Sequence, residues 1–76
     1  MEAIEIHSKA LLIRKAKLGN AHYFTIKSML KLFEIYTSLS LKSEASIIEQ
    51  SINESLINLK ANKDSIINEL NKIKGI

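Results

Sequence analysis

The sequence predicts an all-α protein: a helical hairpin or a three-helix bundle with a long, coiled-coil-like C-terminal helix, completed by oligomerisation. The 76-residue chain has no proline and only two glycines, which are the strongest breakers of regular structure. Apolar side chains recur at the three- and four-residue spacing of helices. A chain this short buries only about 60–65% of its unfolded surface. Because it has no cysteine to form disulfides, association with another chain is the remaining route to a larger core.

The first helix is expected over residues 2–18. Four apolar residues share one face and predict its buried side: Ala3, Ile6, Ala10 and Ile13. Ile4, Leu11 and Leu18 lie beside this face, and Leu12 falls on the polar side. Gly19 is then free to take a positive φ after the helix, and Asn20 is the predicted N-cap of the next helix. Together they predict a tight antiparallel corner.

The second helix is expected over residues 21–39, and it is apolar around most of its circumference. Its polar sector is narrow, consisting of Lys27, Lys31, Glu34 and Ser38. All four aromatic residues of the chain also lie in this segment. A helix of this kind has to be covered on more than one side. Two arrangements satisfy that need: a central position within its own bundle, or a core shared with a partner or a second copy.

The last helix is expected over residues 43–74, after a turn within residues 37–43 capped by Ser40 or Ser43. Its stripe follows alternating steps of three and four: Ile52, Leu56, Leu59, Lys63, Ile66, Leu70 and Ile73. Lys63 interrupts this stripe, either snorkelling to water or setting the register. Gly75 marks the end, with Ile76 placed for a hydrophobic capping contact. A break at residues 61–65, with Asn62 or Asp64 as a new cap, is the alternative. The whole chain, residues 1–76, is read as a single helical domain.

Several classes of function are disfavoured by composition and motifs. No apolar run approaches the roughly 20 residues that span a bilayer, so an integral membrane protein is not expected, and a cytoplasmic location is. His7 and His22 lie on different helices, and no catalytic or phosphate-binding motif is present. We therefore expect no enzyme, no cofactor and no metal site. The abundance of isoleucine, lysine and asparagine is typical of an AT-rich bacterial or phage coding background.

The favoured function is protein–protein interaction, as a small regulator, adaptor or secretion-type chaperone that buries apolar helix faces against itself or a partner. The predicted interface residues on the second helix are Tyr23, Phe24, Ile26, Leu30, Phe33 and Tyr36. Those on the last helix are Ile52, Leu56, Leu59, Ile66 and Leu70.

The alternative function is a small dimeric nucleic-acid-binding regulator. Residues 1–42 carry a net charge of +4 and residues 43–76 a net charge of −1, so the N-terminal half is the one suited to phosphates. The candidate contacts are Arg14, Lys15, Lys17, Lys27 and Lys31. Residues 16–31 loosely resemble a helix-turn-helix core, but the second helix lacks the broad polar face that reads bases in the major groove.

Overall fold

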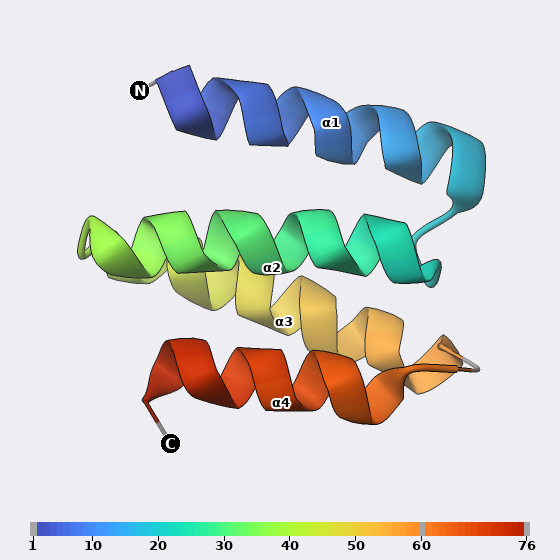
Figure 1. Ribbon diagram of the computed structural model, residues 1–76. Helices are drawn as coiled ribbons and strands as arrows, with labels where there is room; N and C mark the ends of the chain where they lie inside the picture. The colour runs from blue at the N-terminus through green and yellow to red at the C-terminus, as the bar shows by residue number, and fades with distance from the viewer. Residues whose placement is uncertain (1, 60, 76) are drawn as a thin grey trace.

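The computed structural model describes residues 2–59 and 61–75, and in these ranges it is all-helical, with no strand. Four helices follow one another: α1 (Glu2–Leu18), α2 (Tyr23–Ser38), α3 (Lys42–Asn58) and α4 (Lys63–Lys74). Each runs roughly antiparallel to the one before it (Figure 1). The all-α prediction is therefore confirmed, whereas a single C-terminal helix over residues 43–74 is wrong.

The second helix, α2, lies at the centre and contacts each of the other three helices. Its buried apolar side chains are Ile26, Met29, Leu30, Leu32 and Phe33. They meet Leu11 of α1, Ile52 of α3 and Ile66 of α4 in one hydrophobic cluster. The broad apolar surface of α2 is thus covered mainly within its own chain, the first of the two arrangements that the sequence left open.

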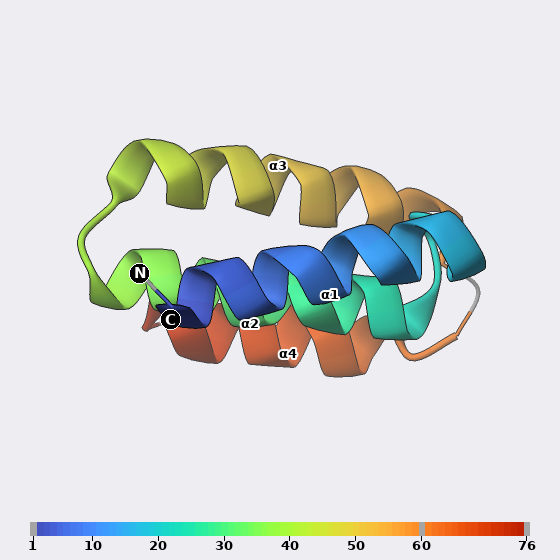
Figure 2. The same cartoon turned by 90° about the horizontal axis from the view of Figure 1, so that it is seen from above.

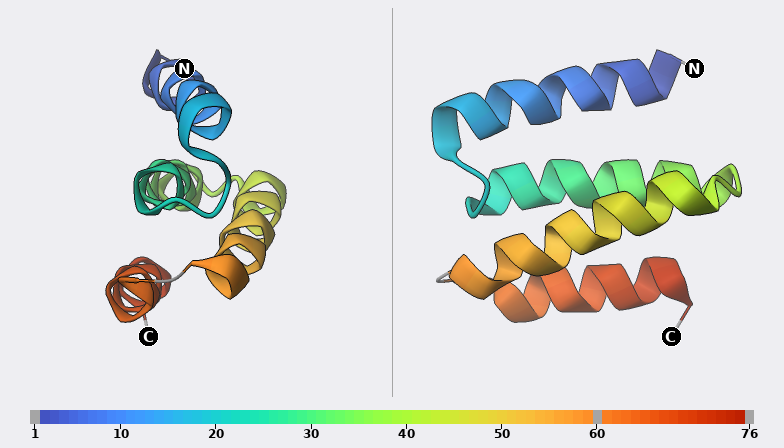
Figure 3. Two further views of the ribbon diagram at one scale, coloured as in Figure 1. Left: turned by 90° about the vertical axis from the view of Figure 1, so that its right-hand side faces the viewer. Right: turned by 180° about the vertical axis from the view of Figure 1, so that it is seen from behind.

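Three helices stand in a row, α1 over α2 over α4, and α3 packs against one side of that row (Figures 2 and 3). The Cα trace is accordingly flat, with extents of 31 × 29 × 16 Å. α1 is the outermost helix of the row and packs along α2. One side of α1, away from α3, is therefore open along its whole length.

The corner between α1 and α2 is built around Gly19, which has a φ of 86° as predicted. The predicted N-cap, Asn20, is wrong: α2 begins two residues later than expected, and His22 is its N-cap. The backbone N–H of Phe24 donates to Nδ1 of His22 at 3.2 Å. The imidazole nitrogen thus satisfies an amide that would otherwise lack a partner at the start of the helix.

The turn between α2 and α3 occurs where it was predicted, but neither predicted cap is used. Ser40 takes a left-handed conformation with a φ of 60°, and the N-cap of α3 is Leu41, without a side-chain cap. Backbone bonds close the turn instead, since the N–H of Leu41 donates to the carbonyl of Tyr36 at 2.9 Å. Ser43 lies inside α3.

The break between α3 and α4 corrects the predicted long helix. A continuous helix over residues 43–74 would be about 48 Å long, roughly twice the length of the 16-residue α2, and its second half would find no core. The chain turns at Asn62, which adopts a left-handed conformation with a φ of 65°. Asparagine tolerates this geometry better than most residues. α4 then folds back along α2 and buries Ile66 and Leu70.

The predicted heptad is therefore divided between two helices. Lys63 is the exposed first residue of α4 rather than a member of a continuous stripe, so neither predicted role for it applies. Gly75 ends α4 with a φ of 80°, as predicted. Ile76, predicted to make the capping contact, lies outside the described residues.

Candidate protein interface

The structure places most of the predicted interface residues inside the chain's own core. Seven of them are buried: Ile26, Leu30, Phe33, Ile52, Leu59, Ile66 and Leu70. Three are partly buried and pack against that core: Tyr23, Tyr36 and Leu56. Phe24 alone is exposed, with 54% of its surface accessible. A partner meeting this conformation would therefore contact little of the predicted set beyond Phe24.

The residues predicted to contact nucleic acid do not form one continuous basic surface. Lys27 Nζ lies 2.5 Å from Glu69 Oε1 on α4, and Lys31 Nζ lies 3.1 Å from Glu34 Oε1. Lys15 instead lines a pocket with residues of α3. Two of the five cations are therefore partly neutralised by carboxylates, and Lys15 belongs to a different part of the surface from Lys27.

Arg14 fastens α1 to α2. Its Nη1 donates to the carbonyl oxygen of Phe24 at 3.1 Å and to the hydroxyl of Ser28 at 2.8 Å. Its guanidinium carbon also lies 5.9 Å from the centre of the Phe24 ring. Because Arg14 reaches across to α2, the face of α1 that carries Leu11 is turned inward, and Leu11 is the only described residue of α1 that is buried.

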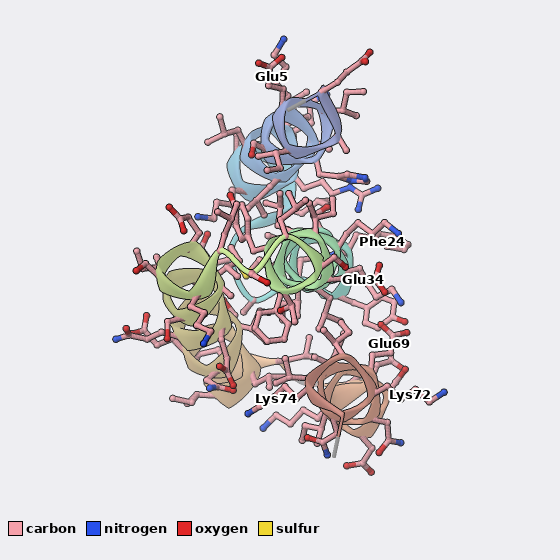
Figure 4. All side chains as sticks on the ribbon, turned by 90° about the vertical axis from the view of Figure 1, so that its left-hand side faces the viewer. Glu5, Phe24, Glu34, Glu69, Lys72 and Lys74 are labelled. Carbon is pink, nitrogen blue, oxygen red and sulfur yellow. The ribbon has the colours of Figure 1, made fainter. Side chains whose placement is uncertain are left out.

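On the face of α1 that was predicted to be buried, Ala3 and Ala10 are partly buried, whereas the two isoleucines are exposed. Ile6 and Ile13 are each 57% exposed. Ala3 and Ala10 occupy the same face at helical spacing, and we call these four residues the α1 stripe. Phe24 lies beside Arg14, which follows Ala10 by one turn. Figure 4, seen down the helices, shows α1 at the outer end of the molecule and Phe24 on the side of α2 away from α3.

Charge is distributed unevenly along α1. Glu2 and Glu5 lie in its first turn, and Lys15 and Lys17 lie in its last turn. This order suits the helix macrodipole. Because Lys15 faces α3, the charged residues at the two ends of the stripe itself are Glu2, one turn before Ile6, and Lys17, one turn after Ile13.

The other exposed apolar side chains are more scattered. Ile47 and Ile57 on α3 are 68% and 75% exposed, but they are ten positions apart. Gln50 and Glu54 lie on the α3 surface between them. Isolated apolar residues of this kind are normal on protein surfaces. The α1 stripe is therefore the strongest candidate interface, a role that the sequence pattern had assigned to the core.

The main apolar pocket lies beside the turn between α2 and α3. It has a volume of about 260 Å³ and is lined by residues that include Phe33, Tyr36, Leu41 and Ala45. Small-molecule sites usually enclose roughly 300–1,000 Å³ and converge a few polar groups on the ligand. This pocket falls below that range.

The described part of the chain has neither a metal-binding cluster nor a helix that could span a membrane. Residues 2–59 and 61–75 contain no cluster of three or more histidine, aspartate or glutamate side chains suited to a metal ion. No helix in the same ranges has the length and apolarity to cross a bilayer. Compared with known proteins, the chain matches no family model, no curated protein and no solved structure.

Proposed function

We propose that this protein is a small protein–protein interaction module that acts by burying the α1 stripe against a helix of a partner. The observation that carries the proposal is the exposure of Ile6 and Ile13 on one face of a helix that packs along a single neighbour. Burying a side chain of this size contributes roughly 1.5–3 kcal/mol. An amphipathic partner helix, whose apolar residues recur at three- and four-residue spacing, is the chemistry that fits.

Binding rather than catalysis is the mode of action in this proposal. Regulator, adaptor and secretion-type chaperone are roles that such a module fills, and each depends on a reversible contact between helices. The nucleic-acid alternative receives no additional support, because Lys27 and Lys31 are already paired with carboxylates.

The test is capture of partners from an extract of the native cells by the tagged protein. Replacing Ile6→Glu and Ile13→Glu together should abolish specific capture, because two charges would have to be buried. The matched control is Ile47→Glu with Ile57→Glu, which makes the same chemical change on α3. Both variants should retain the helical circular dichroism of the parent, since all four side chains are exposed. Identical captured sets for the parent and the stripe variant would overturn the proposal.

A further inference from the structure

We propose that the partner of the α1 stripe is a second copy of this chain, with the two α1 helices packed antiparallel about a two-fold axis. The inference rests on the proposed function and names the partner for the same surface. Three features of α1 carry it: its charge order, the symmetry of its sequence pattern and its position at the edge of the fold.

The charges of two α1 helices complement each other only when the helices run antiparallel. Glu2 and Glu5 occupy one end, and Lys17 occupies the other, whereas Lys15 in the same last turn lines a pocket with residues of α3. A second α1 running parallel would place acidic ends together and basic ends together. A second α1 running antiparallel places each acidic end beside a basic end, which is favourable for both orientation and specificity.

Two pairs of residues on this side of α1, Ile6 with Ile13 and Glu2 with Lys17, are symmetric about one point of the helix. Glu2 precedes Ile6 by one turn, and Lys17 follows Ile13 by one turn. A two-fold axis passing between Lys9 and Ala10 therefore sets Ile6 level with Ile13 of the second copy. The same axis sets Glu2 level with Lys17 of the second copy. A two-fold interface uses the same patch on both chains, and this pattern meets that requirement.

A small residue allows the two helices to approach near the axis. Ala10 lies between Ile6 and Ile13 on each copy, so the two alanines lie close to the axis, between the two pairs of facing isoleucines. α1 is at the outer end of the row of helices, and α3 packs on the other side of α2 from Phe24 (Figures 3 and 4). The surface around the stripe is therefore open to a second helix.

The contact is modest in size. The 17 residues of α1 make a helix about 25 Å long. Stable interfaces usually bury about 800 Å² on each partner, and smaller ones are typical of weak, transient contacts. We therefore expect a weak, reversible dimer.

Sedimentation equilibrium of the full chain over a concentration series is the experiment that tests the dimer. The parent should shift from monomer to dimer as its concentration rises. The Ile6→Glu, Ile13→Glu variant should weaken dimerisation by at least about tenfold for each substitution. The Ile47→Glu, Ile57→Glu control should dimerise like the parent.

The antiparallel register has its own test, which uses charge reversal. Glu2→Lys alone and Lys17→Glu alone should each weaken the dimer by about three- to tenfold at low salt, because each homodimer then places like charges together. An equimolar mixture of the two variants should restore dimerisation, since both facing pairs of residues 2 and 17 are again of opposite charge. Restoration in the mixture is a result that general destabilisation of the fold could not produce.

The outcomes separate this inference from the proposed function. A monomeric parent up to about 1 mM would overturn the second-copy inference, while capture of another protein that is lost in the stripe variant would leave the proposed function standing. A dimer that is unaffected by the stripe substitutions would place self-association elsewhere and overturn the inference. Failure of the mixed charge variants to recover would overturn the antiparallel arrangement.

Discussion

Thr25 is completely buried, and its hydroxyl oxygen has no hydrogen-bond partner among the described residues. A buried polar group left without a partner costs about 1–3 kcal/mol. Its neighbour in the core, Ile26, is equally buried, so water has little access to this part of α2. The unpaired hydroxyl of Thr25 thus lowers the free energy of unfolding of the protein.

Replacing Thr25→Val should stabilise the protein, because valine keeps the branched shape and removes the hydroxyl. The expected gain is about 1 kcal/mol, which corresponds to a rise of about 4–8 °C in the midpoint of thermal unfolding for a chain of this size. Thr37→Val is the matched control, because Thr37 is exposed on the same helix. Unchanged or lower stability of the Thr25 variant would mean that the hydroxyl forms a bond in solution.

At the scale of elements, α2 and the first corner were the parts most open to prediction. The apolar width of α2 indicated that several neighbours must cover it, and the structure surrounds it with three helices. Gly19 marked the corner because few other residues adopt a positive φ. The start of α2 was harder, since His22 caps the helix although asparagine is the more frequent capping residue.

The apolar pattern of α1 does not show which of its faces packs against α2. Apolar residues surround this helix: Ile4 and Leu11 lie on one side, and Ile6 and Ile13 on another. The choice is made by tertiary contacts, because Arg14 bonds to Phe24 and Ser28 on α2. For the same reason the pattern of α1 identifies the stripe but does not show that its isoleucines are exposed. The break before α4 had a local signal in Asn62, but the apolar stripe that continues on both sides of it favoured a single helix.

Because α1 has one buried residue and packs along one helix, it should open more readily than α2. Native-state hydrogen exchange should therefore show lower protection for amides of α1 than for those of α2. Arg14→Ala should speed exchange in α1 by about tenfold or more, since hydrogen bonds to a charged group contribute about 1.5–3 kcal/mol. Leu12→Ala, at an exposed position of the same helix outside the α1 stripe, is the control. Equal exchange in the two variants would show that Arg14 does not hold α1.

At the scale of the whole molecule, opposite charges join the basic N-terminal half to the acidic C-terminal half. The contact is the ion pair between Lys27 on α2 and Glu69 on α4. A second pair, Lys74 with Glu49 at 2.7 Å, holds the end of α4 to α3. Since the main packing of α4 is on α2, the Lys27–Glu69 pair is placed where α4 docks. It should therefore affect how firmly the last helix is attached.

The pH dependence of stability should report this pair. The hydrogen bond to Glu69 raises the pKa of Lys27 above its ordinary value of 10.5, against the opposing effect of partial burial, and attraction to the carboxylate adds to the rise. A pKa that is raised on folding contributes stability that is fully present below the unfolded pKa and is lost as pH rises through the folded pKa. The contribution of the Lys27–Glu69 pair to the free energy of unfolding should thus be constant around neutral pH and be lost as pH rises above 10.5.

Urea unfolding of the parent and of Glu69→Gln, at pH 7 and at about pH 11.5, measures the effect. At pH 7 the variant should be less stable by no more than about 1 kcal/mol, because the two side chains remain 35% and 39% exposed. The difference in free energy of unfolding between the parent and the variant should become smaller at high pH, because Lys27 loses its proton there and the parent loses the attraction as well. Glu34→Gln removes the partner of Lys31, which is more exposed, and should show a smaller gap at pH 7. A gap between the parent and Glu69→Gln that stayed constant across the pH range would mean that Glu69 stabilises α4 by packing rather than by charge.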